Sequence, residues 1–140
     1  MNLKAVLDSV KESRDKAQTL LKDLRNLWDD EEAFVKRLLE VEDSSLLLYP
    51  TVLILIADKL QTMDNPNLYN QFSVLENLEL YHINAEMCPN DISGYIELAL
   101  FYDVILGNSE EALLIIEKAL KINKKMSEDL ATALKEVKDI

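Results

Sequence analysis

The sequence contains very little glycine, proline, cysteine and histidine. Its 140 residues include two glycines, three prolines, one cysteine and one histidine. So few chain-breaking residues leave room for few turns, and this composition predicts long helical segments. The single cysteine, Cys88, has no partner for an intrachain disulfide, as is usual in a reducing compartment. We therefore expect a helical protein of the cytoplasm.

The same scarcity excludes several catalytic classes. Most nucleophilic and zinc-dependent mechanisms need more histidine or cysteine than this chain has, and two isolated glycines cannot form a phosphate-binding loop. Glu79 and His82 form one Glu-x-x-His pair, whereas a di-iron bundle takes such a pair from two helices, so only a site shared across a dimer would fit. We expect no enzyme activity, no catalytic residue, no cofactor and no metal.

Basic residues are outnumbered by acidic ones, 15 to 26. The net charge of -11 would repel a phosphate backbone, so we do not expect nucleic-acid binding. The acidity either keeps the protein soluble or attracts a basic partner, and the composition alone leaves both readings open. The acidic runs at residues 29–32 and 40–43 lack the ligand spacing and the glycine of a calcium loop, which favours helix capping and solvation.

No apolar run is long enough to cross a membrane. The longest, from Leu46 to Ala57, falls short of the ~20 residues that a membrane-spanning helix needs, and we expect it to be a buried helix. Charged residues follow Met1 too soon for the apolar core of a signal peptide. With 49% hydrophobic residues the chain is not disordered, and its length suits one domain.

Apolar spacing and capping residues predict seven helices. Pro50 either kinks the third of these helices or marks its first turn, and Asn65 with Pro66 begins the fourth. The last helix begins at Ser127. Its apolar residues lie along one face, which is typical of a helix that covers the end of a domain. The predicted ranges are about 3–28, 31–42, 44–63, 66–87, 93–106, 109–123 and 127–140.

Two alanines indicate close packing between the fifth and sixth helices. Ala112 and Ala119 are seven residues apart, so they lie on nearly the same side of a helix and let a neighbouring helix approach closely. Ala99 lies among the larger Tyr95, Leu98 and Tyr102 on the preceding helix. The short link at Gly107 then forces the two helices into an antiparallel hairpin.

This spacing resembles the tetratricopeptide repeat, a helical hairpin of about 34 residues with aromatic and small residues at fixed positions and a closing proline. One extra residue separates Tyr102 from Gly107, and Lys124 stands where the closing proline would be. A second, weaker match covers residues 50–91. The positions that match the signature best are Tyr95, Leu98, Ala99, Tyr102, Gly107, Ala112, Ile116 and Ala119.

The resemblance implies one all-α domain of antiparallel helices wound into a right-handed superhelix of hairpins. Its parts are N-terminal helices at 1–49, hairpins at 50–91 and 92–123, and a capping helix at 124–140. In the weaker hairpin, Asn77 and Asn84 take the small positions, which suggests looser or hydrogen-bonded packing. A generic helical bundle is the alternative, because it would use the same small-residue contacts.

The function that the resemblance implies is a non-catalytic protein-interaction module, an adaptor or a small chaperone-like protein that binds a peptide or helix of a partner. The apolar surface expected to bind is covered either by the N-terminal helices or by that partner. The alternative is a structural homodimer assembled through the amphipathic first helix. The residues predicted to bind the partner are Ile96, Leu100, Phe101, Asp103 and Val104.

Overall fold

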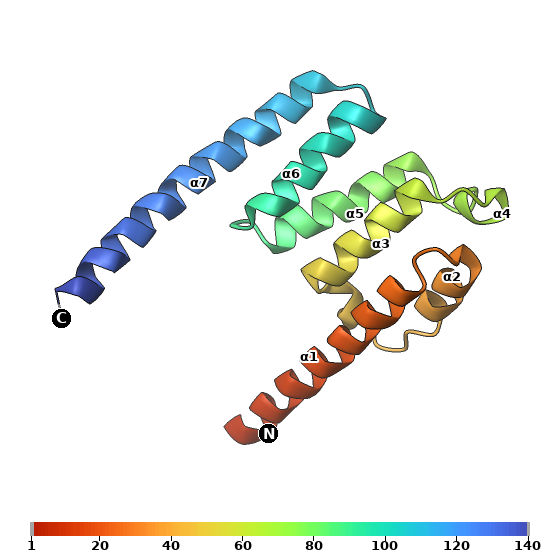
Figure 1. Ribbon diagram of the computed structural model, residues 1–140, viewed down its shortest axis with the longest axis horizontal. Coiled ribbons are helices and arrows are strands. Elements are labelled where there is room, and N and C mark those ends of the chain that lie inside the picture. The colour runs from red at the N-terminus through yellow and green to blue at the C-terminus, as the bar shows by residue number, and fades with distance from the viewer. Residues whose placement is uncertain (1, 140) are drawn as a thin grey trace. The chain divides into compact units, whose positions relative to one another are not determined.

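The structure, a computed structural model, describes residues 2–139 and is built from helices, with no strand in that range (Figure 1). The prediction of an all-α protein is confirmed. The chain divides into two compact units, one ending at Leu80 and one beginning at Tyr81. Within the described range, no helix is both long enough and apolar enough to cross a membrane.

Each helix of the first unit begins at a residue that satisfies or removes a free backbone N–H group. The Asn2 side chain accepts from the Ala5 N–H, and the Asp30 side chain accepts from the Ala33 N–H. Pro50 is the first helical residue of its helix rather than a kink. The elements are α1 (Leu3–Asn26), α2 (Glu31–Leu39), the 3-10 turn η1 (Ser44–Leu48), α3 (Pro50–Thr62), α4 (Pro66–Tyr69) and the start of α5 (Val74–Met87).

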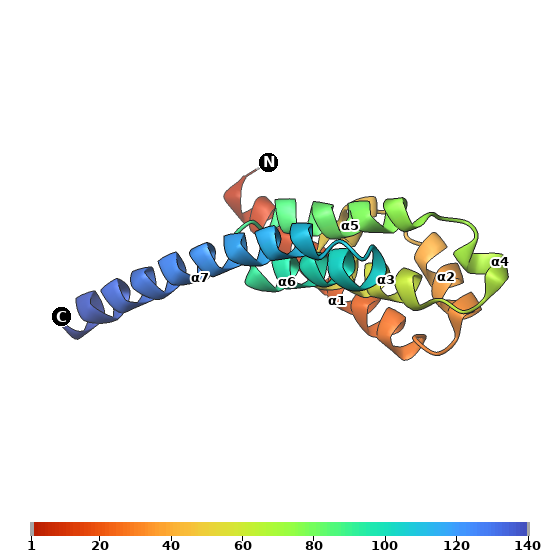
Figure 2. The ribbon, with the colours of Figure 1, turned by 90° about the horizontal axis from the view of Figure 1, so that it is seen from above.

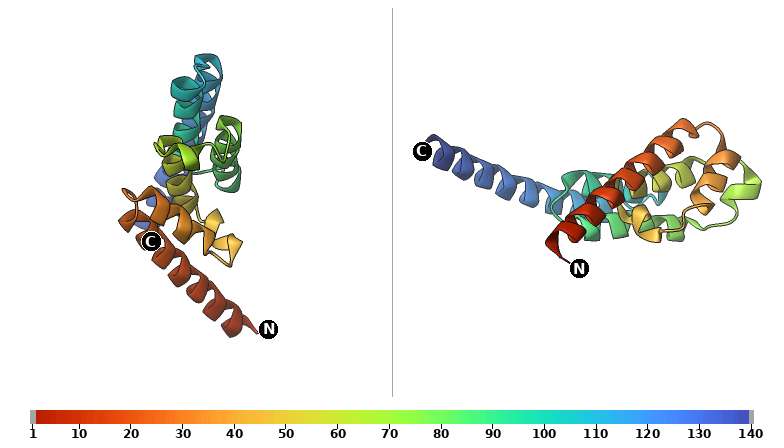
Figure 3. Two further views of the ribbon diagram at one scale, coloured as in Figure 1. Left: turned by 90° about the vertical axis from the view of Figure 1, so that its right-hand side faces the viewer. Right: turned by 90° about the horizontal axis from the view of Figure 1, so that it is seen from below.

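The core of the first unit lies between α1, α2, η1 and α3. Phe34 is fully buried there and meets Trp28 edge to face, with ring centroids 6.2 Å apart. Only the second half of α1 contributes, while its first turns project from the rest of the unit (Figure 3). The buried members of this core are Ala17, Leu20, Leu24, Phe34, Leu46, Val52 and Ile56.

The sequence predicts one helix over 66–87, and the structure corrects this by breaking it between α4 and α5. Ser73 and Glu76 cause the break, because they form a reciprocal capping box at the start of α5. The Ser73 Oγ accepts from the Glu76 N–H at 3.1 Å, and the Glu76 carboxylate accepts from the Ser73 N–H at 3.3 Å. The Ser-x-x-Glu motif is present in the sequence and would have predicted this helix start.

The second unit is an antiparallel hairpin of α6 (Ile92–Leu100) and α7 (Ser109–Lys138), preceded by the second half of α5. The two predicted contact alanines of α7, Ala112 and Ala119, are buried, as close packing requires. Ile116 departs from the predicted pattern, because it is 41% exposed and Ile115 is the buried isoleucine. On the facing helix the buried residues are Gly94, Tyr95, Leu98 and Ala99.

Between α6 and α7 the backbone forms a π turn, η2 (Phe101–Ile105). The Leu106 N–H donates to the Phe101 carbonyl, five residues back, at 3.2 Å. A π turn holds one residue more than an α turn, so it accommodates the extra residue between Tyr102 and Gly107 without breaking the helix. Gly107, with φ of 62°, then ends it in a conformation that favours glycine.

The sequence also predicts a separate capping helix at 124–140, and this prediction is wrong. α7 continues without interruption to Lys138 and runs past the start of α6 (Figure 2). Nothing between Asn123 and Ser127 can stop a helix, because Lys124 replaces the proline that would have removed a backbone N–H. The segment predicted as a capping helix is therefore the exposed second half of α7.

Replacing Ala119 with leucine should overpack the α6–α7 contact and lower the free energy of unfolding by about 1–3 kcal/mol. The measurement is urea unfolding followed by circular dichroism. Ala131, an exposed residue of the same helix, provides the control, since leucine there adds the same volume facing water. Equal unfolding midpoints for Ala119→Leu and Ala131→Leu would show that Ala119 does not face a close helix.

Candidate partner-binding surface

Three apolar side chains lie open to solvent along α6 and η2. Ile96, Leu100 and Val104 are 48%, 50% and 70% exposed, and they follow one another in steps of four residues. Side chains spaced in this way share one side of a helix. We call this set the α6 face. These residues are three of the five that the sequence predicts to bind a partner.

The other two predicted residues have different surroundings. Phe101 is only 3% exposed, and its ring centroid lies 5.0 Å from that of Tyr81 on α5. It is a core residue, so its predicted contact with a partner is corrected. Asp103 is exposed, and its carboxylate accepts a 2.6 Å hydrogen bond from the Ser109 hydroxyl, which ties η2 to the first turn of α7.

The α6 face lies in a stretch of chain with no positive side chain. No lysine or arginine occurs between Lys59 and Lys118. The net charge of the whole chain does not show this local asymmetry. The positions of the lysines and arginines along the sequence do show it. Acidic surroundings raise the local concentration of cationic partners and speed their association. The acidic residues of this stretch within the second unit are Glu86, Asp91, Glu97, Asp103, Glu110, Glu111 and Glu117.

The only histidine, His82, pairs with a tyrosine. Its Nε2 atom is hydrogen-bonded to the Tyr102 hydroxyl at 2.8 Å, and the two rings meet edge to face. Burial raises the pKa of the Tyr102 phenol above its ordinary value, and the nearby Glu111 carboxylate raises it further. The phenol therefore stays protonated at neutral pH. Among residues 2–139, no group of three histidine, cysteine or acidic side chains is placed to hold a metal ion.

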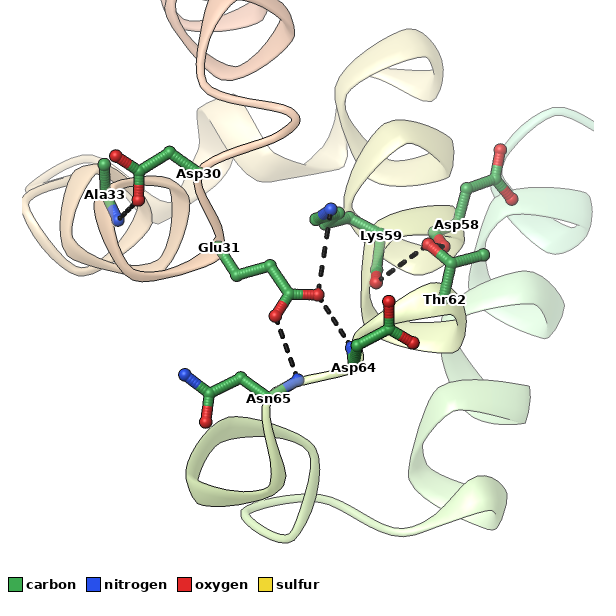
Figure 4. Close-up of polar contacts among 8 residues, drawn as sticks. All are labelled: Asp30, Glu31, Ala33, Asp58, Lys59, Thr62, Asp64 and Asn65. Carbon is green, nitrogen blue, oxygen red and sulfur yellow. Dashed lines mark hydrogen bonds and ion pairs between the residues drawn. The ribbon is translucent and has the colours of Figure 1, made fainter.

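A second polar cluster, in the first unit, was not predicted from the sequence. The two carboxylate oxygens of Glu31 accept from the backbone N–H groups of Asp64 and Asn65 at 2.7 and 2.9 Å (Figure 4). The buried Lys59 Nζ lies 3.9 Å from the Glu31 carboxylate and 4.9 Å from the centroid of the Trp28 ring. These contacts hold the start of α2 against the turn that follows α3. We therefore infer that the cluster stabilises the fold.

Comparison with known proteins adds no further constraint. No family model, curated protein or solved structure matches this chain. The candidate site is therefore defined by its own chemistry, which is an open apolar strip on a hairpin whose surroundings are acidic. Residues Ile96, Leu100 and Val104 form the strip, and Asp103 stands beside it.

Proposed function

We propose that the protein is a non-catalytic interaction module, an adaptor or small chaperone-like protein of tetratricopeptide-like hairpins, that binds a basic amphipathic helix of a partner protein on the α6 face. The observation that carries this proposal is the exposure of Ile96, Leu100 and Val104 in a stretch with no cationic residue. Most of the hairpin residues that resemble the repeat signature are buried or form the link, and we expect them to support the binding face without touching the partner.

A basic amphipathic helix complements this surface in two ways. Its apolar side would remove the α6 face from water, which contributes about 25 cal/mol for each Å² of apolar surface buried. Its lysine or arginine residues would meet carboxylates such as Glu97 and Asp103, which steer the approach and set the partner's orientation. Because the apolar contact is small, the charges are expected to contribute much of the selectivity.

Affinity capture tests this proposal. The variant Leu100→Asn with Val104→Thr keeps the charge of the α6 face and removes most of its apolar character. We expect wild-type protein to retain a partner that the variant loses, and we expect raised salt to release that partner. Both positions are at least half exposed, so the variant should fold normally.

A matched control uses two leucines on another side of the hairpin. Leu113 and Leu120 on α7 are 59% and 61% exposed, so Leu113→Asn with Leu120→Asn removes a similar apolar area elsewhere. The control should retain the partner. The proposal fails if the α6-face variant captures the same proteins as wild type, or if both variants lose them alike.

A homodimer assembled through α1 is the second candidate. The first half of this helix exposes Leu3, Val6, Leu7 and Val10, which follow one another at steps of three, one and three residues along one side. The second half is part of the core, so removing the whole helix would destroy the first unit. Charge changes on α7 would not alter the dissociation constant of this dimer. That insensitivity distinguishes it from a dimer that pairs through α7.

A further inference from the structure

The buried side of α7 continues as an apolar stripe beyond α6. Lys118 Nζ lies 5.3 Å from the centroid of the Tyr95 ring in the first turn of α6, and Ala119 is the last buried residue of α7. At 100° per residue, the apolar residues that follow lie within about 80° of one another and on the side of Ala119. We call this set the α7 stripe: Ile122, Met126, Leu130, Ala133 and Val137.

Within the second unit, no other described element covers the far end of this stripe. Leu130 is 70% exposed and Val137 is 68% exposed, and every residue from Asn123 to Asp139 is open to solvent. Monomeric proteins seldom leave a helix face of this length unpaired. The stripe therefore needs an occupant, and its own residues indicate which one.

We propose that the α7 stripe pairs with the α7 stripe of a second copy of this chain, antiparallel, about a two-fold axis between Asp129 and Leu130. In that register Leu130 meets Leu130 of the second copy. Ile122 then faces Val137 on either side, and Met126 faces Ala133, so a larger side chain meets a smaller one in these layers. Ile122 with Val137, and Met126 with Ala133, are placed symmetrically about this axis, as an isologous contact requires.

One pair of opposite charges beside the stripe suits the same register, although Asp129 of the two copies also meet on this edge near the axis. Lys125 and Glu136 lie on one edge of the stripe, about 20° apart around the helix. In an antiparallel pair each edge faces the same edge of the other helix, which brings Lys125 of one copy to Glu136 of the other, twice per dimer. A parallel pair cannot do this, because the two residues are separated by about 16 Å along the axis.

The register also leaves α6 in place. Val137 of the second copy falls opposite Ile122, where the cover provided by α6 ends. The paired length is 16 residues in each copy, or about 24 Å, which makes a small interface. We therefore expect a dimer that dissociates on dilution. Because the α6 face is not part of the contact, this dimer would be compatible with the proposed function and does not depend on it.

Charge reversal and exchange test the pairing on the full chain. Lys125→Glu places two glutamates together at each end of the contact, and Glu136→Lys places two lysines together. Each single variant should raise the dimer dissociation constant by about tenfold or more. The double variant Lys125→Glu with Glu136→Lys should restore the wild-type value, because the pair is exchanged and kept. Sedimentation equilibrium over a concentration series at low salt measures all four proteins, and circular dichroism checks their helix content.

Every alternative gives a different pattern. A wild-type chain that stays monomeric at all concentrations overturns the proposal. Dimerisation through α1 overturns it too, and would leave all four dissociation constants equal. If the second half of α7 instead binds the acidic α6 face of another copy, Glu136→Lys would strengthen association rather than weaken it. Failure of the double variant to recover would show that Lys125 and Glu136 do not meet.

Discussion

Replacing Phe34 with alanine should lower the free energy of unfolding by about 3–5 kcal/mol. Phe34 is fully buried among the core residues that α1, η1 and α3 contribute, and it packs edge to face on Trp28. Alanine would remove most of these contacts and leave a cavity, because helices held at several points relax only partly. Urea unfolding followed by the fluorescence of Trp28, the only tryptophan, reports on this unit directly.

Leu39→Ala is the matched control for Phe34→Ala. Leu39 is on the same helix but is 80% exposed, so its truncation removes little buried surface. We expect a change within about 0.5 kcal/mol for this control. If Phe34→Ala were no more destabilising than Leu39→Ala, the first unit would not be built around α2 as described.

Glu31→Gln should lower the free energy of unfolding by about 2–4 kcal/mol at neutral pH, because the change removes a charge that three groups share. Glutamine has a single acceptor oxygen, so one of the backbone N–H groups of Asp64 and Asn65 loses its partner. Lys59, only 6% exposed, loses its nearby carboxylate as well. The measurement is again urea unfolding at pH 7.

Glu32→Gln provides the control for Glu31→Gln. Glu32 is the next residue along the same first turn and is exposed, so its charge contributes only the small interaction with the helix dipole. A change of less than about 1 kcal/mol is expected for this control. Equal losses for the two variants would mean that Glu31 acts only through the helix dipole and not through its contacts with the turn after α3.

Local signals predicted most of the helix boundaries. Asp30, Pro50 and Gly107 each fix the backbone where they stand, so neighbouring residues suffice to place a boundary there. The close contact at Ala112 and Ala119 was also predictable, because small residues at a spacing of seven have few other uses on an apolar helix side.

Other features depend on what a segment meets in space, and sequence reasoning missed them. The Ser127, Glu128 and Asp129 run looks like the start of a helix, yet the helix simply continues because no residue before it breaks the backbone hydrogen bonding. Phe101 resembles a surface residue of its helix and is buried only because Tyr81 of α5 lies against it. Likewise, no local pattern links Glu31 to Lys59, although an isolated lysine in an apolar run is a signal for a partnered charge.

The two proposals together suggest how the protein would work. Pairing through the α7 stripe would give an assembly with two α6 faces, and an assembly of this kind binds a partner with two matching helices more tightly than a single copy does. The charge pattern suits this division, since the second half of α7 carries Lys124, Lys125, Lys135 and Lys138, while the α6 face stands among carboxylates.

The measurement that tests the proposed function most directly is hydrogen–deuterium exchange of the full chain with and without its captured partner. If the α6 face binds the partner, the partner should slow exchange of the backbone amides from Ile96 to Leu106, including the π turn. Protection restricted to the first half of α1 or to the second half of α7, with residues 96–106 unchanged, would contradict the account.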